Sequence, residues 1–202
     1  MVLQKLVDWW KLADLPETIS RRLVDLIVPI SYTTKRDQLT EATKGNLAVA
    51  SRWLKKHPSA RLAFSNCAYT FPGAAAVERK LKLDYLKRLG NKVKFLLAGD
   101  SNNSVEEALQ IRSACGKEGS SPRRILIVTG EMHSRSARLI WGWVFPKAEI
   151  LVSCTSYRCE AQPDHPVRVQ RSYWKWFAAN IARQVLLRVL GLKLARFHHR
   201  TS

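Results

Sequence analysis

The residues best suited to chemistry follow an apolar run late in the sequence, where RILIVT is succeeded by GEMHSRSAR. His133 falls at or just before the start of a helical pattern, with Arg135 in its first turn and Arg138 three residues later on a nearby face. Basic side chains are unfavourable in a first turn, because the helix dipole attracts anions there. A bound anion would offset that cost, and the surrounding positive charge would favour a neutral imidazole that can act as acid or base. A surface histidine beside a solvated arginine has the same spacing, so both interpretations stand.

A second polar stretch, GDSNNS, joins a strand pattern to a helix pattern. Gly99 favours a turn, Asp100 is a candidate base or cation ligand, and Asn103 and Ser104 stand at the predicted helix start. Unsatisfied N–H groups at a helix start favour an anion. The alternative is that Asn103 and Ser104 only shape and cap the helix, with Ser104 and Glu107 forming a capping box.

Several well-known cofactor and nucleophile motifs are missing from the sequence. The stretch after the first predicted strand reads SYTTKRD and offers Lys35 and Arg36 but no glycine, so neither a dinucleotide fingerprint nor a P-loop is present. No GxSxG elbow occurs. Thr129 and Gly130 end the strongest strand pattern, and Gly130 permits a tight exit from it. Glu78 is a carboxylate near the same edge that serves either as a base or as a solvated helix residue.

Short apolar runs alternate with longer amphipathic patterns along the chain. This alternation predicts an α/β fold, a three-layer Rossmann-like parallel sheet of about five strands with helices on both faces. Residues 1–24 form an N-terminal helical extension, and residues 25–202 form one domain closed by a basic C-terminal helix. Predicted strands span 26–32, 61–67, 92–98, 124–129 and 149–154, and predicted helices span 2–13, 14–24, 41–56, 74–89, 104–115, 134–144 and 173–194, the last with a bend at Gly191. Because ligands of such folds bind outside the carboxyl ends of the strands, we expect the site in the loops 31–37, 66–73, 99–104 and 130–135.

The 202 residues carry a net charge of +18, which favours an anionic partner, although basic runs of this kind also form ordinary solvated faces. Residues 51–100 hold 11 basic and 3 acidic side chains, and residues 151–202 hold 9 and 2, so the excess lies in two segments. No signal peptide or apolar stretch of about 20 residues is present, which predicts a cytoplasmic protein, with a peripheral location at the inner membrane face as the alternative. The four cysteines have no metal-binding spacing and are expected to be unbridged, with no metal bound.

Together these residues resemble the bacterial envelope-associated family of SanA, ElyC and YdcF, over about residues 25–155. Asp25 precedes the first predicted strand, Gly73 and Glu78 follow the second, and NSVEEA (103–108) matches the next family stretch. IVTGEMHSRSAR, with His133, carries most of the resemblance. Ser136 stands where the family usually has an arginine, and the glycines after the first strand and the membrane anchor of the envelope members are missing.

The resemblance implies a Rossmann-like fold with a polar pocket at the strand edge, a role in cell-envelope metabolism and no settled reaction, so enzyme status stays open. One branch of the family looks like a binder of a nucleoside of the S-adenosylmethionine type. We therefore expect a small anionic ligand, phosphorylated or nucleotide-like. The alternative is a peripheral membrane protein that recognises anionic or prenyl-phosphate lipid. Nucleic-acid binding is less favoured, because the aromatic residues do not interleave with the basic runs.

The candidate catalytic residues are His133 and Glu78, and the candidate ligand-binding residues are Lys35, Arg36, Gly99, Asp100, Asn103, Ser104, Thr129, Gly130, Arg135 and Arg138.

Overall fold

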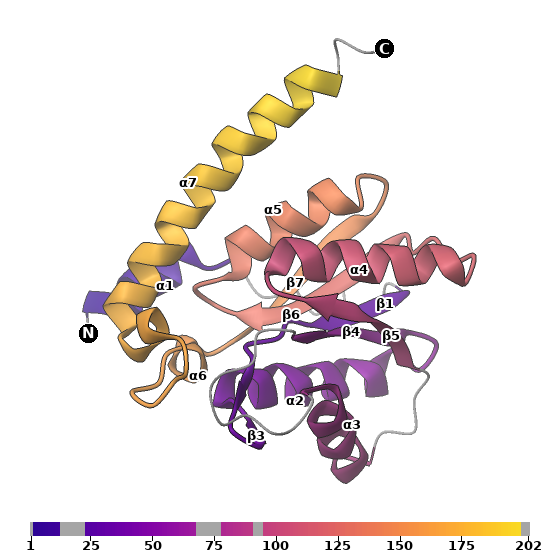
Figure 1. The fold of residues 1–202 in the computed structure, drawn as a ribbon, viewed down its shortest axis with the longest axis horizontal. Coiled ribbons are helices and arrows are strands. Elements are labelled where there is room, and N and C mark those ends of the chain that lie inside the picture. Colours follow the sequence, from indigo (N-terminus) through magenta and orange to yellow (C-terminus); the bar gives the residue numbers. More distant parts are fainter. Residues whose placement is uncertain (1, 13–22, 68–77, 91–94, 199–202) are drawn as a thin grey trace.

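A parallel five-stranded sheet forms the centre of the molecule (Figure 1). The computed structural model describes residues 2–12, 23–67, 78–90 and 95–198. The strands lie in the order β5-β4-β1-β6-β7, and every neighbouring pair is parallel. Their bounds are β1 (Leu26–Pro29), β4 (Arg61–Cys67), β5 (Phe95–Ser101), β6 (Arg124–Gly130) and β7 (Glu149–Thr155).

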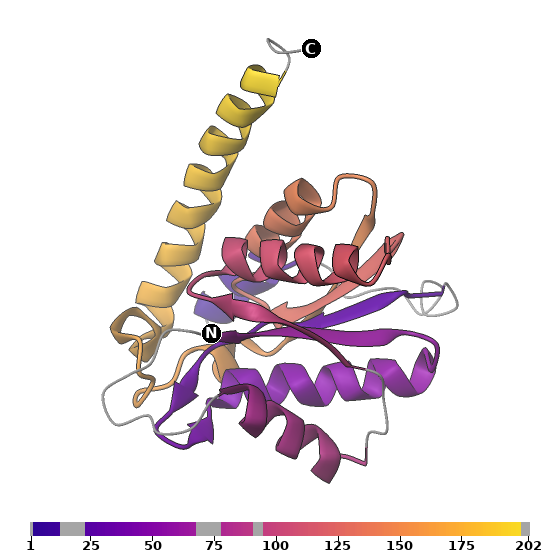
Figure 2. The same ribbon diagram turned by 45° about the vertical axis from the view of Figure 1, so that its right-hand side comes forward.

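Helices cover both faces of this sheet (Figures 1 and 2). Successive residues of a strand point to opposite faces, so Leu26 and Val28 join one apolar core while Ile27 joins the other. On the first core pack α4 (Ser104–Lys117) and α5 (Ser134–Val144), and on the second pack α2 (Glu41–Lys56) and α3 (Glu78–Arg88). The predicted α/β, Rossmann-like fold is thereby confirmed.

The two terminal helices lie together at one end of the domain (Figure 1). The helix α1 (Val2–Trp10) buries Val7 and Trp10, and Trp10 Nε1 donates to the Met132 carbonyl over 2.9 Å. The helix α7 (Tyr173–His198) buries Trp176, Phe177 and Leu187, and its C-terminal part projects away from the body (Figure 2). Apolar residues occur nearly all round this helix in the sequence, which favours packing against the sheet. The structure instead buries one stripe of the helix and leaves Val185, Leu186, Val189 and Leu190 exposed.

The strand predicted over 26–32 is shorter in the structure, where β1 ends at Pro29. Beyond it the backbone bonds to side chains: Tyr32 N–H donates to Thr43 Oγ1 over 3.0 Å, and Ser31 N–H donates to Glu107 Oε1 over 3.4 Å. The predicted loop 31–37 also contains a small hairpin of β2 (Thr34–Lys35) and β3 (Gln38–Leu39).

The stretch GDSNNS differs from its prediction in two ways. Gly99 and Asp100 belong to β5, because Asp100 pairs with Asn66 beyond a bulge in β4, so they are not loop residues. The N-cap of α4 is Asn103 rather than Ser104, since its Oδ1 accepts the Val105 and Glu106 N–H groups over 3.0 Å. The predicted capping box with Glu107 is therefore wrong.

Some predictions fall partly outside the described residues, namely the helix at 14–24, the start of the helix at 74–89 and the start of the strand at 92–98. The segment 158–166, which the sequence indicates to be an irregular connection, overlaps α6 (Tyr157–Glu160) and is followed by a 3₁₀ turn, η2 (Arg168–Arg171). The helix α7 continues beyond its predicted end at residue 194 and reaches His198. Within the described ranges, no helix is long and apolar enough to span a bilayer.

Candidate functional site

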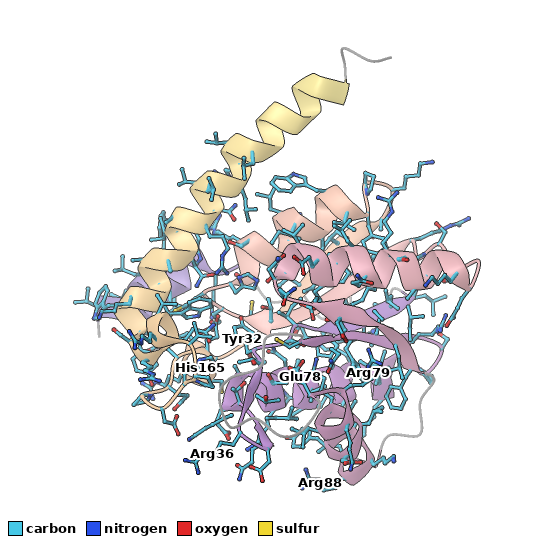
Figure 3. The ribbon with its side chains drawn as sticks, viewed as in Figure 1. Tyr32, Arg36, Glu78, Arg79, Arg88 and His165 are labelled. Carbon is cyan, nitrogen blue, oxygen red and sulfur yellow. The ribbon has the colours of Figure 1, made fainter. Side chains whose placement is uncertain are left out.

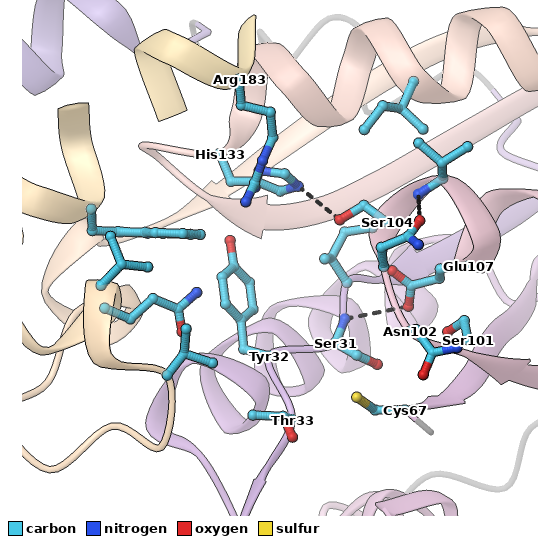
Figure 4. A pocket seen from close by; sticks show the side chains of 18 of the residues that line it. Ser31, Tyr32, Thr33, Cys67, Ser101, Asn102, Ser104, Glu107, His133 and Arg183 are labelled. Carbon is cyan, nitrogen blue, oxygen red and sulfur yellow. Dashed lines mark hydrogen bonds between the residues drawn. The ribbon is translucent and has the colours of Figure 1, made fainter. Parts of the chain in front are cut away.

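A cavity of about 860 Å³ opens at the carboxyl ends of the strands (Figure 4). The chain runs outward from β1 to β4 and β5 and then crosses back to β6, so the strand order reverses between β1 and β6. Ligands of open α/β sheets bind at this kind of switch point. The lining residues come from the loops after β1, β5 and β6, from the end of β4 and from the segment 166–187, and include Ser31, Tyr32, Thr33, Cys67, Ser101, Asn103, Ser104, Glu107, His133, Gln170, Trp176 and Arg183.

The floor of the cavity is a network of hydroxyl groups around a buried carboxylate. Glu107, on α4, is 3% exposed and accepts from Ser31 N–H and, over 3.3 Å, from Ser65 Oγ. Ser65 and Ser101 share a further hydrogen bond of 2.8 Å. Burial raises the pKa of Glu107 to about 7, so near neutral pH this carboxyl group is partly protonated and its negative charge is reduced.

A buried ion pair supports this floor from below. Lys82 is completely buried, and its Nζ lies 3.1 Å from Glu78 Oε2 and donates to Ser31 Oγ and, over 3.0 Å, to the Ser65 carbonyl. Glu78 also accepts from Cys67 N–H over 2.7 Å, which ties α3 to the end of β4. Figure 3 shows Glu78 on this lower side of the sheet. Glu78 thus positions the floor without lining the cavity.

His133 forms the opposite wall between α4 and α7 (Figure 4). Its Nε2 lies 3.4 Å from Ser104 Oγ, and its Nδ1 lies 3.1 Å from Asn180 Oδ1 and 3.3 Å from a guanidinium nitrogen of Arg183. Burial, and then the charge of Arg183, lower the pKa of His133 to about 3, while the contact with Asn180 opposes the shift. The imidazole is therefore neutral at physiological pH, as the sequence predicted, although the cation beside it is Arg183 rather than Arg135.

The third wall comes from η2 and α7 and is mainly apolar. Trp176 is 3% exposed, and the Arg183 guanidinium stacks 5.3 Å from the centre of its ring. Gln170 is buried, and its Oε1 has no hydrogen-bond partner in the structure. Ile140, Val167, Val169 and Leu187 complete this side. The cavity therefore combines a polar floor with an apolar wall, and this wall carries a cation and an unsatisfied acceptor.

Glu160 joins these walls behind the cavity. It is fully buried, and its two carboxylate oxygens accept from Met132 N–H over 2.7 Å, Tyr32 Oη over 3.0 Å and Trp176 Nε1 over 3.1 Å. Burial raises the pKa of Glu160 to about 7 against the opposing effect of these donors. A Cβ on Gly130 would lie 1.9 Å from Glu160 Cδ. Glycine is thus required here by the packing of Glu160, not by the tight strand exit that the sequence suggested.

No protein-family model, curated protein or solved structure matches this chain. The chemistry of the cavity therefore rests on its own side chains. Among the described residues that line it, Arg168 and Arg183 are cationic and Glu107 is the one carboxylate, which leaves the cavity with an excess of positive charge. No three His, Cys, Asp or Glu side chains within the described ranges converge into a group suited to a metal ion.

The structure brings three of the predicted site residues, Asn103, Ser104 and His133, to the cavity. Thr129 lies beneath it, buried and 3.2 Å from Tyr32 Oη. The side chain of Asn103 is used to cap α4, so the Val105 and Glu106 N–H groups are already satisfied. Gly130 and Glu78 act from behind the walls and below the floor, as described above.

The remaining predicted residues lie away from the cavity. Lys35 forms an ion pair with Asp164, and Arg36 is exposed in the hairpin turn with a φ of 54° (Figure 3). Gly99 lies within β5, and Asp100 points outward and accepts from Asn66 over 3.0 Å.

Arg135 and Arg138 belong to a different part of the surface. Arg135 donates to the Trp10 and Trp9 carbonyls at the end of α1, where a cation is favourable to the helix dipole. With Arg138 and Arg188 it borders a separate hollow of about 360 Å³ between α1, α5 and α7. The prediction that Arg135 lies beside His133 is therefore wrong.

The functional residues that the sequence did not reveal come mostly from α7. Asn180, Arg183 and Gln184 are polar positions inside a long apolar helix, and spacings of three and four place them on one face. That polar stripe is the signal that sequence reasoning could have used. The partners of Glu107 and Lys82 gave no such signal, because they meet only when β1, β4, α3 and α4 pack together.

Proposed function

We propose that this chain binds a small anionic ligand, phosphorylated or nucleotide-like, in the cavity at the carboxyl edge of the sheet, as a member of the SanA, ElyC and YdcF family. The observation that carries the proposal is Arg183. Its guanidinium is partly buried against the cavity, and no carboxylate of the described residues lies within ion-pair distance of it. Burial lowers the pKa of Arg183, which reflects the cost of withdrawing this charge from water. A bound anion would offset that cost.

The rest of the cavity supports an anion with an apolar or aromatic part. The wall around Trp176 and Leu187 offers a surface for a nucleobase or a prenyl chain. The unpartnered Gln170 Oε1 offers an acceptor for a hydroxyl or amino group of the ligand. The single carboxylate of the lining, Glu107, already accepts two hydrogen bonds and is partly neutralised, so it opposes an anion less than an ordinary glutamate would.

A melting panel tests this proposal. The probes are inorganic phosphate, adenosine monophosphate, S-adenosylmethionine and farnesyl phosphate, measured with the wild-type protein, Arg183→Gln and Arg52→Gln. A ligand present at 100 times its Kd should add about 2.7 kcal/mol to the stability of the folded state. We expect this shift in the wild type and in Arg52→Gln, which removes the same charge from the exposed face of α2, but not in Arg183→Gln.

Salt separates a shaped site from general attraction to the +18 charge. At 1 M salt the Debye length falls to about 3 Å, so exposed charges no longer attract distant ions. A shift that persists under this condition supports a cavity site. If no probe shifts the melting temperature, or if Arg183→Gln and Arg52→Gln respond alike, the proposal is wrong.

A second candidate function, docking on an anionic membrane, has its own observation. The second half of α7 leaves the body and exposes Leu186 and Val189 by 57% and 46% (Figures 1 and 2). The neighbouring hollow between α1, α5 and α7 is bordered by three arginines, Arg135, Arg138 and Arg188. Apolar insertion next to basic side chains is the composition of an interfacial helix, in which each basic residue near an anionic surface contributes roughly 1 kcal/mol.

Vesicle flotation tests this second candidate with the full chain. We expect co-flotation with vesicles that contain phosphatidylglycerol and little with pure phosphatidylcholine. Leu186→Ser should reduce it, whereas Leu109→Ser, which alters a comparably exposed leucine on α4, should not. Equal partitioning of both variants would remove α7 as the docking element.

A further inference from the structure

Three polar side chains form a line through the wall of the cavity. Ser104 Oγ lies 3.4 Å from His133 Nε2, and His133 Nδ1 lies 3.1 Å from Asn180 Oδ1. They come from three separate elements, the start of α4, the loop after β6 and the middle of α7. Ser104 lines the cavity and is partly exposed, and His133 beside it is buried (Figure 4). Asn180 is also buried. A hydroxyl, an imidazole and an orienting acceptor in this order are the arrangement that activates a serine nucleophile.

Two groups compete for Nδ1 of His133. Asn180 Oδ1, which can only accept, lies 3.1 Å away, and an Arg183 guanidinium nitrogen, which can only donate, lies 3.3 Å away. The Asn180 Nδ2 group donates to the Trp176 carbonyl over 2.8 Å, which turns Oδ1 toward the histidine. We assign the shorter contact as the hydrogen bond. In that tautomer Nδ1 donates to Asn180, and the lone pair of Nε2 faces Ser104 Oγ. Asn180 is in this sense a positioning residue for the imidazole.

We propose that Ser104 is the nucleophile of an ester-cleaving activity in this cavity, with His133 as its general base and acid and Asn180 as the positioning residue. In the first step Ser104 Oγ bonds to the carbonyl carbon of the ester while its proton passes to His133 Nε2. The bond from that carbon to the leaving oxygen then breaks, and His133 gives the proton to the departing alcohol. Water adds to the acyl-serine and gives a proton to His133. The bond between carbon and Ser104 Oγ breaks as that proton returns to the serine, so that one carboxylic acid and one alcohol are released.

Other serines around the cavity are less suited to this role. Ser31 Oγ receives a hydrogen bond from Lys82 Nζ, which is paired with Glu78, and no imidazole of the described residues forms a hydrogen bond with it. Ser101 is hydrogen-bonded to Ser65 on the floor. Among the described residues, Ser104 is the serine whose hydroxyl faces the basic nitrogen of a neutral histidine.

The substrate class follows from the side chains beside the triad, and this part rests on the proposed function. Arg183 lies 3.3 Å from His133 Nδ1, where its positive charge disfavours a protonated imidazole. A substrate that carries its own negative charge near Arg183 would offset this charge and make His133 more basic. The wall around Trp176, Val169 and Leu187 would take an apolar acyl group. The favoured substrate is thus an anionic ester with an apolar acyl chain.

Covalent labelling tests the nucleophile without knowledge of the natural substrate. The folded full-length protein is treated with a fluorophosphonate probe, and the labelled residue is located by peptide mass spectrometry. We expect one label on Ser104, no label in Ser104→Ala, and wild-type labelling in Ser113→Ala, which makes the same change on the exposed side of the same helix. His133→Gln should slow labelling by roughly 10²-fold or more.

The role of Asn180 is tested by the pH profile of labelling. Arg183 and Asn180 of α7, Tyr32 of the loop after β1 and Ser104 of α4 are the groups that face His133. In Asn180→Asp the new carboxylate still accepts from Nδ1 and stabilises the imidazolium, so the decline of labelling at acid pH should move to higher pH. Asn180→Leu should label more slowly at every pH. An unchanged profile in Asn180→Asp would show that Asn180 is only structural.

The two proposals fail in different ways. No labelling of the wild type beyond that of the unfolded chain, labelling at another serine, or equal labelling of Ser104→Ala overturns the nucleophile, whatever the melting panel shows. Ser104→Ala should retain its melting shift with the anionic probes, because Arg183 is intact. An absent melting shift together with Ser104 labelling would remove the anion site and leave the nucleophile standing. Release of nitrophenol from nitrophenyl hexanoate and nitrophenyl hemisuccinate then checks the preference for an anionic ester.

Discussion

At the scale of single residues, the cavity is organised by charged groups that the fold has removed from water. Lys82, Glu107 and Glu160 are each at most 3% exposed, yet each makes at least two hydrogen bonds to the segments that line the cavity. Buried charges are tolerated only when they are paired or hydrogen-bonded. Their presence around one cavity therefore indicates that buried polar contacts hold its shape.

Gly130 offers a direct test of this network. In Gly130→Ala the new Cβ would collide with Glu160, whose bonds to Met132, Tyr32 and Trp176 would have to break or shift. We expect a loss of about 2 kcal/mol or more in the free energy of unfolding, measured by urea denaturation. Gly116→Ala is the control, because nothing lies within 4 Å of its added Cβ and alanine should stabilise α4 by about 0.5–1 kcal/mol. Similar losses in both variants would contradict the assigned role of Glu160.

At the scale of elements, α7 is the helix that completes the cavity, and it does so with residues up to Leu187. The buried stripe of this helix includes Trp176, Asn180 and Gln184, while Trp174 and Val185 on other sides of the helix are exposed by 53% and 58%. A single stripe of contacts fixes how α7 crosses the sheet edge and hence where Arg183 and Asn180 stand relative to His133.

Two adjacent leucines distinguish the buried stripe from the exposed side. Leu187 is 8% exposed and lines the cavity, whereas Leu186 is 57% exposed. Leu187→Ala should lower the free energy of unfolding by about 2 kcal/mol, because it leaves a void, while Leu186→Ala should stay within about 0.5 kcal/mol of the wild type. Chemical denaturation of the two variants measures this difference. Equal effects would mean that α7 docks through another face.

The sequence predicted the elements better than it predicted the site, for a physical reason. Apolar periodicity and caps are local, so the helices Glu41–Lys56 and Ser134–Val144 and the strand Arg61–Cys67 were predicted with the bounds that the structure has. The site depends on contacts between distant segments, such as His133 with Asn180 and Tyr32 with Glu160, which no spacing reveals. His133 and Ser104 could be found because they stand at helix starts beyond strands. The predicted position of Arg135 beside His133 was wrong because its guanidinium donates to the Trp10 carbonyl at the end of α1. This is a tertiary contact that local spacing does not reveal.

At the scale of the whole molecule, the +18 charge and the cavity are largely separate features. Many of the basic residues that the structure describes lie on helix surfaces and set what the protein attracts from a distance, whereas Arg183 is the cation held beside His133. The cavity also concentrates groups with shifted pKa values. Because these pKa values differ between the folded and unfolded chain, the free energy of unfolding of the domain depends on pH.

Four buried groups set this pH dependence. The pKa values of Glu107 and Glu160 rise from 4.5 to about 7, so between these values the folded chain holds protons that the unfolded chain has released, and stability falls as pH rises. The pKa values of His133 and His165 fall from 6.5 to about 3 and about 4, so below pH 6.5 the unfolded chain binds protons that the folded chain does not, and stability falls as pH drops. The two effects oppose each other between pH 4.5 and 6.5.

We therefore expect a melting temperature that is nearly constant between pH 4.5 and 6.5 and declines on both sides. A shift of the size given for Glu107 corresponds to about 3 kcal/mol between the extremes. In Glu107→Gln the decline above pH 6.5 should become shallower, because one of the two carboxyl groups that cause it is gone. Glu106→Gln is the matched control: the pKa of Glu106 is lowered, first by the hydrogen bond from the Asn102 backbone, so its removal should leave the alkaline decline unchanged. Calorimetric scans from pH 4 to 8 measure these slopes, and an alkaline decline of equal steepness in both variants would mean that Glu107 is ionised in the folded protein.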